Sequence, residues 1–522
     1  MKIPSILLSI PCVFAAAQAA EPDQRPNILF GIMDDTSYPH MSAYGTTWVN
    51  TPAFDRLAEE GILFENCYTP NAKCAPSRAT VLTGRQTWEL EQIGVHAAVW
   101  PETRYKTWME ALAENGYVSG FTGKPWGPGR VEGNPDRPLV GQEYNMHTAP
   151  PPARFIAGSD YARNFEQFLD DNEDGKPWAF WYGSREPHRP YDFGAGIRVG
   201  GKDPSDIDEV PPYWPDNETI RTDMLDYAFE IEHADRHLGR MLELLEERGE
   251  LDNTIVVFTS DNGMPFPRAK GMQYEVSNHM PLAIMWRDGI KNPGRVEEGF
   301  ISFVDFAPTF MAAAGLDMEK AGMEPSSGKD MREIFEDSLR KQDWGYILLG
   351  QERHDIGRPN NQGYPIRSII EDGFLYMHNF KPHLWPAGNP ETGYLNTDGS
   401  PTKTYILNLR RDGVDKQFWE LNFGKNPREQ LYHIAVDPHC IVNLAYKPEY
   451  QEIKEALKEK LFTDLKRTND PRVVGPDGDI FDSYPFWREQ AFDFYERFMA
   501  GEATPEQTGW VNPSDYEEEP LD

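Results

Sequence analysis

One apolar stretch near the start of the chain indicates the class of fold. It reads Pro26-Asn27-Ile28-Leu29-Phe30-Gly31-Ile32-Met33 and is followed by two carboxylates, Asp34 and Asp35. A short apolar run bounded by proline and acids is typical of a strand buried in a parallel sheet. Residues 179–182 (Ala-Phe-Trp-Tyr) and 254–258 (Thr-Ile-Val-Val-Phe) repeat this form further along the chain. We therefore expect buried parallel strands at these three places.

Helical patterns lie between these runs. Residues 51–61 offer a capping threonine, a proline in the first turn and a closing glycine, and residues 224–248 form a longer helical segment that stops at Gly249. Strands that alternate with helices predict an α/β fold, in which a large, mostly parallel sheet is sandwiched by helices. Ligands bind to such sheets beyond the carboxyl ends of the strands.

The pattern changes after about residue 363. Residues 367–370 and 374–377 flank the turn Glu371-Asp372-Gly373, which is typical of an antiparallel hairpin. Apolar residues then recur every fourth position between Ile453 and Leu465, which predicts a helix. These features indicate a smaller C-terminal subdomain, made of an antiparallel sheet plus a helix.

A chain of 522 residues exceeds what one hydrophobic core usually organises, so we expect two folded units. We predict a catalytic α/β domain at residues 21–363 and the C-terminal subdomain at residues 364–510. We assign residues 511–522 to an acidic tail, and we expect disorder in its mostly acidic last stretch, Asp515 to Asp522.

The charge balance excludes some classes of partner. Arginine and lysine number 51 against 84 acidic residues, which gives a formal net charge of −33. Such a surface repels the phosphate backbone of nucleic acids and anionic membranes. Residues 1–20 have a charged start, a short apolar stretch and small residues before a cleavage point, as secretion signals do. We expect a periplasmic or secreted protein with no integral membrane segment.

Polar side chains follow two of the predicted strands. Asp34 and Asp35 end the first strand, and Asp261 and Asn262 follow the third. Four hard oxygen donors at one sheet edge suit Ca²⁺ or Mg²⁺ better than Zn²⁺. The alternative is that either pair only caps a strand.

The segment that begins at Cys74 carries the strongest signal. Pro76 marks the first turn of a helix, so Cys74 is expected at a helix N-terminus, where free amides and the helix dipole favour an anion. Considered on its own, this is a cysteine of lowered pKa beside Arg78, and a redox thiol or a capping accident is the alternative. Cys67 and Cys440 are expected to be buried as small apolar residues.

The order Cys74-x-Pro76-Ser77-Arg78, followed by Leu82-Thr83-Gly84, resembles the signature of the formylglycine-dependent (type I) sulfatases of the alkaline phosphatase superfamily. Further matches to that family occur in the same order along residues 26–475: Asp34-Asp35, Thr51-Pro52 with Leu57, Gly123-Lys124, Pro187-His188, Thr259 to Gly263, Leu431-Tyr432, Asp437-Pro438 and Asn443-Leu444.

The resemblance implies that Cys74 is oxidised to formylglycine (3-oxoalanine) by a formylglycine-generating enzyme. Of the two hydroxyls of the hydrated aldehyde, one attacks sulfur and the other later expels sulfate. The resemblance also implies a calcium ion, with magnesium less favoured, held by residue 74 together with Asp34, Asp35, Asp261 and Asn262.

The resemblance further implies roles for the basic residues. Arg78, Lys124 and Lys270 supply fixed positive charge to the sulfate, and His188 protonates the leaving oxygen or nitrogen. One position departs from the family pattern, because Trp126 stands where a histidine usually follows the Gly-Lys pair. His96 or His147 is a candidate to replace it, and an ordinary structural role is the alternative for each.

Within the family, three segments are most similar to the heparan N-sulfatase (sulfamidase) branch: residues 261–267, 364–368 and 468–471. This favours a sulfated saccharide as substrate, with N-sulfoglucosamine as one hypothesis. Arg353 and His354 are candidates to bind the sugar, against the alternative of a surface loop. Tyr364 and Trp385 offer sugar-stacking faces, although aromatic residues of this kind are more often core.

Other functions remain open at this point. The first alternative is an O-sulfatase for another polysaccharide, such as an ulvan-like algal glycan. A further alternative is a catalytically silent protein that binds sulfated sugars. A phosphatase or phosphonate-ester hydrolase of related fold is less favoured, because those enzymes usually carry threonine or serine at the position of Cys74.

Overall fold

The structure is a computed structural model that describes residues 25–337, 344–476, 478–488 and 491–521. The predicted signal peptide at residues 1–20 lies outside the described residues. Within the described residues, no helix combines the length and the apolar character that crossing a bilayer requires.

The larger sheet has nine strands in the order β10-β2-β9-β8-β1-β7-β4-β6, with β11 also paired to β2. Neighbouring strands run parallel except where β9 meets β8 and β2, so the predicted mostly parallel sheet is confirmed. The strands are β1 (Asn27–Met33), β2 (Ile62–Tyr68), β4 (Val118–Gly123), β6 (Gln142–Glu143), β7 (Trp178–Gly183), β8 (Thr254–Ser260), β9 (His279–Met285), β10 (Arg295–Glu297) and β11 (Ile301–Ser302).

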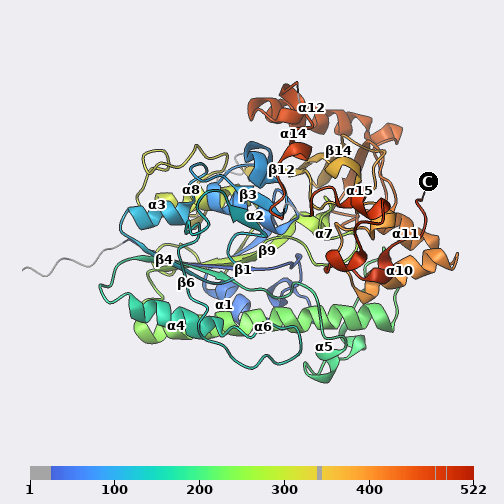
Figure 1. Cartoon of the computed structure of the whole chain (residues 1–522). Helices are drawn as coiled ribbons and strands as arrows, with labels where there is room; N and C mark the ends of the chain where they lie inside the picture. Colours follow the sequence, from blue (N-terminus) through green and yellow to red (C-terminus); the bar gives the residue numbers. More distant parts are fainter. Residues whose placement is uncertain (1–24, 338–343, 477, 489–490, 522) are drawn as a thin grey trace, which may run out of the picture.

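Helices cover both faces of this sheet, as Figure 1 shows. On one face lie α1 (Pro52–Glu60), α4 (Tyr161–Asp171) and α6 (Glu218–Arg248), whose buried side chains share one apolar core. On the other face lie α2 (Cys74–Thr83), α3 (Trp108–Glu114) and α8 (Phe306–Ala313), which share a second core. The predicted sandwich is therefore confirmed.

The two ends of α6 are determined by local sequence signals. The side chain of Asn217 accepts a hydrogen bond from the backbone amide of Ile220 and caps the helix, and Gly249 ends it in the left-handed conformation at φ 69°. The predicted end is correct. The helix begins at Glu218, six residues before the predicted start at Met224, because the cap lies upstream of the apolar repeat.

The second sheet is antiparallel, with the order β12-β13-β14-β15. Its strands are β12 (Tyr346–Gln351), β13 (Ile366–Glu371), β14 (Phe374–Asn379) and β15 (Glu429–His433), and α12 (Gln451–Arg467) packs against it. The predicted hairpin is the pair β13 and β14. The first strand of this sheet precedes residue 364, where we placed the domain boundary, so the sheet begins on the other side of that predicted boundary.

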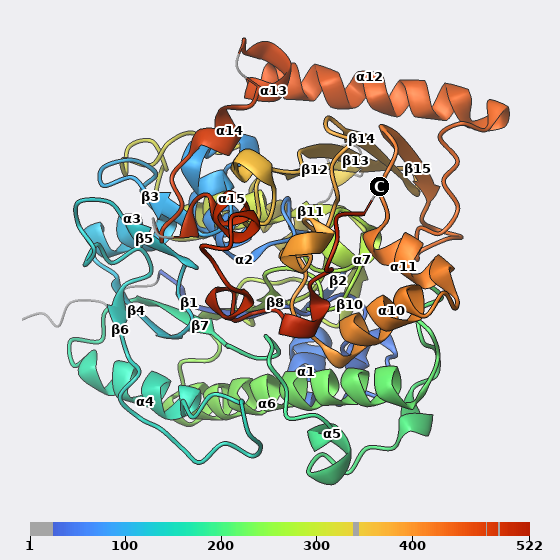
Figure 2. The same cartoon turned by 45° about the vertical axis from the view of Figure 1, so that its right-hand side comes forward.

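The remaining elements are short and lie around the two sheets (Figure 2). They include β3 (Ala98–Trp100), β5 (Gly129–Val131), α5 (Ala195–Arg198), α7 (Glu275–Asn278), α9 (Arg332–Phe335), α10 (Pro401–Arg411), α11 (Lys416–Phe423), α13 (Pro471–Val474), α14 (Ile480–Ser483) and α15 (Phe494–Met499).

The acidic tail is packed, and the expectation of disorder for its described residues is wrong. Asp515 is fully buried and accepts a hydrogen bond of 2.7 Å from the Thr404 hydroxyl. Glu517 pairs with Arg410 at 2.6 Å and with Arg411 at 3.2 Å. Composition suggested disorder, but cations on α10 hold these acids in place.

Candidate functional site

Adjacent strands bring the two predicted acidic pairs together. β1 and β8 run parallel with Met33 opposite Ser260, so the next residues, Asp34 and Asp261, leave the sheet side by side. The backbone amide of Asp35 donates to Asp261 Oδ1 at 3.1 Å. The convergence of these carboxylates therefore follows from the strand register.

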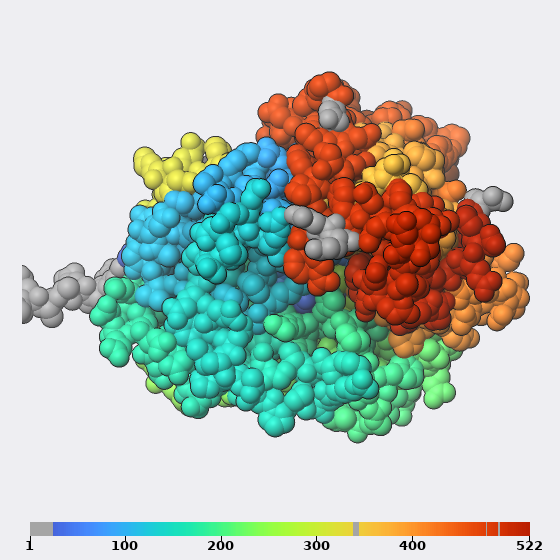
Figure 3. All heavy atoms as spheres, in the orientation of Figure 1, coloured from blue at the N-terminus to red at the C-terminus, as the bar shows by residue number. Residues whose placement is uncertain are grey.

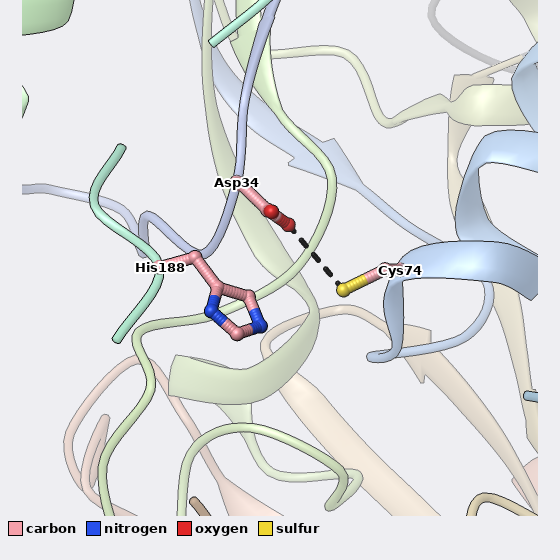
Figure 4. Close-up of side chains that lie close together, drawn as sticks. All are labelled: Asp34, Cys74 and His188. Carbon is pink, nitrogen blue, oxygen red and sulfur yellow. Dashed lines mark hydrogen bonds between the residues drawn. The ribbon is translucent and has the colours of Figure 1, made fainter. Parts of the chain in front are cut away.

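Cys74 is the first residue of α2, and its thiol points at this cluster (Figure 4). The thiol donates to Asp34 Oδ1 at a distance of 3.3 Å, and Sγ lies 4.0 Å from Asp35 Oδ1. One ligand atom from each of Asp34, Asp35, Cys74 and Asp261 lies within 4.8 Å of the others. The predicted position of Cys74 at a helix N-terminus is correct.

The expected low pKa of Cys74 is wrong. Burial raises the pKa of its thiol well above the ordinary value, and the adjacent Asp34 carboxylate raises it further. Lys124 and Lys270 offset only part of this effect. The side chain is therefore held as a neutral thiol, which does not suit a reactive thiolate.

Three cations surround the acids: Arg78 and Lys270 are buried, and Lys124 is half-buried. Lys124 Nζ donates to both oxygens of Asp34 at 2.6 Å, and Lys270 Nζ donates to Asp35 Oδ2 at 2.7 Å. The guanidinium of Arg78 donates through Nε to Asp261 Oδ2 at 2.7 Å. Lys124, Lys270 and Arg78 thus each donate a hydrogen bond to a different carboxylate of the cluster.

His188 follows β7, the other neighbour of β1, and approaches the cluster from that side (Figure 4). Its Nδ1 lies 2.7 Å from the carbonyl oxygen of Arg189, which only accepts, so Nδ1 carries a proton. Its Nε2 lies 3.9 Å from Asp35 Oδ2. Nε2 is therefore the ring nitrogen that faces the acidic cluster.

The donor set fits a hard divalent cation. Burial raises the pKa of Asp261 to about 6, because Arg78 offsets the loss of solvent only in part and Asp34 repels the charge. Asn262 donates through Nδ2 to Asp35 Oδ1, while its buried Oδ1 has no hydrogen-bond partner in the described part of the chain. Crowded carboxylates and an unsatisfied amide oxygen are ligands that calcium accepts.

Two cavities open onto the cluster. The inner cavity has a volume of about 220 Å³ and is lined by Cys74, His188 and Lys270 among others. The outer cavity has a volume of about 560 Å³, and it shares Pro128, His188 and Trp487 with the inner one. Together they form one cleft that leads from the surface to Cys74.

The comparison with protein families decides the identity of this site. The profile of the sulfatase family matches residues 26–316, which is more than half of the chain and includes every residue of the cluster. The chain belongs to the sulfatase family.

Relatives of this sulfatase act on different saccharides. It is 26% identical over 494 residues to the N-sulphoglucosamine sulphohydrolase of Homo sapiens, a match that covers 87% of this chain and 93% of the relative. It is also 26% identical over 489 residues to an ulvan-active sulfatase of Formosa agariphila, over 84% of this chain and 74% of the relative.

Solved structures confirm the fold of the sulfatase. A protein solved in complex with its substrate D-glucosamine-2-N,6-O-disulfate superposes with a TM-score of 0.60 at 20% identity, over 86% of this chain and 99% of that one. The phosphonate monoester hydrolase of Agrobacterium radiobacter has a TM-score of 0.59 at 18% identity, over 86% and 97%. These likenesses describe the fold alone.

Trp126 of the sulfatase does not take over the role of the histidine usual at its position. Its indole Nε1 donates to the carbonyl of Ala75 at 3.0 Å, and its ring packs edge-on against Trp100. Of the two candidate replacements, His96 lines the inner cavity together with Cys74, whereas His147 lines neither of the two cavities.

The two predicted sugar-binding residues lie outside the cleft. Arg353 is fully buried, and its guanidinium donates to the carbonyls of Asp482, Tyr484 and Pro485. His354 is also fully buried, and its Nε2 contacts Asn71 Oδ1 at 2.8 Å. Because these groups are already used inside the protein, the predicted sugar contacts are not formed by this geometry.

We expect the replacement of Arg353 by methionine to lower the free energy of unfolding by about 2–4 kcal/mol, because several carbonyls lose their donor. Urea unfolding followed by circular dichroism measures the change. The matched control is Arg163→Met, since Arg163 is an exposed arginine that pairs with Glu166 on α4. Equal urea midpoints for wild type and the Arg353 variant would contradict this role.

The remaining sequence-predicted residues belong to the core. Tyr364 is fully buried and Trp385 is 7% exposed, so the core alternative holds for both. Cys67 and Cys440 are buried free cysteines, as expected.

The sequence did not point to Asp398, which Lys270 contacts at 2.8 Å, or to Asp355, which pairs with Lys73 and His96. Both acids line the inner cavity. They lie in irregular segments without a family motif, so only the fold reveals them.

Proposed function

We propose that this sulfatase removes sulfate from a saccharide, as an ester or an N-sulfate, through a formylglycine made from Cys74. The Cys74 thiol stands in for the aldehyde of that residue. The observation that carries the proposal is the position of Sγ, 3.3 Å from Asp34 Oδ1 inside a buried cluster of carboxylates and cations. An oxidised residue 74 provides the nucleophile in this position.

A calcium ion is the cofactor that we propose for the cluster, with magnesium less favoured. Asp34, Asp35, Asp261, Asn262 and residue 74 would hold it, and it would lower the pKa of the attacking hydroxyl and neutralise sulfate oxygens. Without an ion, the charges of the three carboxylates match those of Arg78, Lys124 and Lys270. A divalent cation makes the site positive, which a sulfate requires.

The basic side chains around the cluster have different roles in the proposed reaction. Lys124 and Lys270 lie beside the attack position and bind sulfate oxygens as negative charge develops. Arg78 orients Asp261, and the nearest approach of its guanidinium to Asp34 is 3.7 Å. His188 gives a proton to the leaving atom through Nε2, because Nδ1 is engaged by a carbonyl.

The substrate that we favour is a saccharide with N-sulfoglucosamine at its end. The support is the match to the human N-sulphoglucosamine sulphohydrolase, which covers 93% of that relative, and a small inner cavity that suits one terminal sugar. An O-sulfatase for an algal glycan is the second candidate, since an ulvan-active sulfatase is equally identical to this chain. If Cys74 is never oxidised, the third candidate is a protein that binds sulfated sugars without catalytic activity.

The burial of Cys74 bears on its maturation. Cys74 is 1% exposed, and the surrounding residues Ala75 to Arg78 are buried as well. A sulfatase-maturing enzyme therefore has to reach this segment before folding is complete. We propose that maturation precedes folding, and that residues 1–20 direct the protein to the periplasm or out of the cell.

The proposed activity is tested by sulfate release. Matured protein is incubated with N-sulfated, 6-O-sulfated and 2-O-sulfated sugars, and the free sulfate is measured by ion chromatography. We expect the fastest release from the N-sulfated sugar. Rapid ester cleavage without any N-sulfate release would overturn the N-sulfate preference but leave the sulfatase assignment.

Removal of the metal gives a separate prediction. Dialysis against a calcium chelator is expected to lower kcat by at least about 100-fold, because the attacking hydroxyl and the sulfate lose their neutralising charge. Added Ca²⁺ should restore kcat more fully than added Mg²⁺. Added Ca²⁺ should also raise the melting temperature of the protein. Unchanged turnover after chelation, in protein shown by elemental analysis to be free of metal, would contradict the proposed cofactor.

A further inference from the structure

The C-terminal end of the chain forms part of the wall around Cys74. We call residues 484–488 and 491–511 the roof segment. It lies beyond the part of the chain that the family profile matches. Three of its large side chains, Trp487, Arg488 and Trp510, line the inner cavity that also contains Cys74. In Figure 3 the C-terminal part of the chain, in red, borders the N-terminal part, in blue to teal.

The roof segment is anchored on both sides of the cavity. The backbone amide of Trp487 donates to the carbonyl of Ala97 at 2.8 Å. The indole Nε1 of Trp510 donates to the carbonyl of Leu395 at 2.9 Å, and the amide of Gly399 donates to the carbonyl of Trp510 at 2.8 Å. These contacts make Trp487 and Trp510 fixed parts of the cavity wall.

The other basic groups that line the inner cavity already have carboxylate partners. The distances are 3.1 Å from Lys73 to Asp355, 3.2 Å from His96 to Asp355, 2.8 Å from Lys270 to Asp398 and 3.9 Å from His188 to Asp35. Their charge is therefore largely balanced by protein acids.

Arg488 differs from these groups. It is exposed, and it forms no ion pair with any acid among the described residues. Its guanidinium carbon lies 4.4 Å above the ring centroid of Trp487. In a chain of net charge −33, an arginine at the cavity wall that pairs with none of the described acids is a local attraction for anions.

We propose that Arg488 binds a second anionic group of the saccharide, apart from the sulfate that is removed, while Trp487 and Trp510 contact the faces of the sugar. This inference rests on the proposed sulfatase function and narrows its substrate to a sugar with two anionic groups. A planar guanidinium binds the oxygens of a carboxylate or a sulfate in pairs, and indole rings offer flat apolar surfaces.

The test compares Arg488→Gln with wild type on four substrates: a synthetic aryl sulfate, a singly sulfated monosaccharide, the same monosaccharide with a second sulfate, and a sulfated monosaccharide with a carboxylate. We expect KM to rise about 10–100-fold for a doubly anionic sugar, because a charge-assisted contact is lost. The aryl sulfate and the singly sulfated sugar should be unaffected. Whichever of the two doubly anionic sugars responds identifies the second group as a sulfate or a carboxylate.

The control for charge is Arg248→Gln at the end of α6, which borders the opposite, amino-terminal edge of the sheet. Arg488→Lys should recover part of the lost affinity. Trp510→Phe keeps a ring, whereas Trp510→Ala removes it, so only the alanine variant should weaken the binding of all sugars. An equal change in KM on all four substrates, or no change on any, would overturn the proposal.

Binding separates this proposal from the proposed function. Calorimetry with Cys74→Ala protein measures the Kd of the same monosaccharides without turnover. An increase in Kd of tenfold or more on adding Arg488→Gln, confined to a doubly anionic sugar, supports the proposal even if the matured protein releases no sulfate. If Cys74→Ala protein has the same Kd for both doubly anionic sugars whether or not it also carries Arg488→Gln, the proposal is overturned, even if sulfate release is rapid.

Discussion

Replacing Cys74 with alanine is expected to lower sulfate release by at least about 10⁴-fold, because the residue that becomes the nucleophile is lost. The side chain is buried at the start of α2, and its thiol contacts Asp34. Alanine keeps the helix start and removes only the sulfur. The loss should appear in kcat, measured by ion chromatography of free sulfate.

The chain supplies a matched control for this variant. Cys67 is also a fully buried free cysteine, but it lies in β2 and away from the acidic cluster. Cys67→Ala should change stability by a similar small amount and leave kcat unchanged. A Cys74→Ala protein that retains a tenth or more of the wild-type kcat would show that residue 74 is not the nucleophile.

The second large effect is expected for Asp35→Asn. Asp35 is fully buried, contacts Lys270 and Asn262, and has a left-handed backbone at φ 82°. Asparagine adopts this backbone at little cost and has nearly the same shape, so the change removes mainly one negative charge. Losing one carboxylate from the proposed calcium site should lower kcat/KM by at least about 10³-fold.

Raised Ca²⁺ should recover part of the activity of Asp35→Asn, since the remaining ligands still form most of the site. The control is Asp226→Asn, a buried aspartate on α6 that accepts hydrogen bonds from the amides of Gly194 and Gly196. That variant should retain its activity and its calcium response. Full activity of Asp35→Asn in the absence of added Ca²⁺ would argue against Asp35 as a metal ligand.

Local patterns in the sequence were enough to predict many of the strands and helices of the fold. The apolar run before Asp34 forms β1, and Gly249, which follows the long helical repeat, ends α6. The strand ends also predicted which residues meet, because parallel neighbours place their carboxyl ends at one edge. In the structure Met33 of β1 lies opposite Ser260 of β8, so the residues that follow them leave the sheet side by side, as expected.

The parts that failed depend on contacts between distant segments. Arg353 lies in a polar stretch that looks like a surface loop, yet it is buried because the chain returns near residue 484 to cover it. The pKa of Cys74 depends on burial and on Asp34, which is 40 residues earlier, whereas the sequence shows only the nearby Arg78. Trp487, Arg488 and Trp510 lie in an irregular segment, where no periodic pattern indicates a place beside Cys74.

The most direct test of the central claim is the mass of a peptide that contains residue 74, measured by mass spectrometry in protein purified from cells with a sulfatase-maturing enzyme. We expect an aldehyde in place of the thiol, in a fraction of molecules that rises and falls with kcat across preparations. An unmodified thiol at residue 74 in protein that releases sulfate at its full rate would contradict the proposed formylglycine nucleophile.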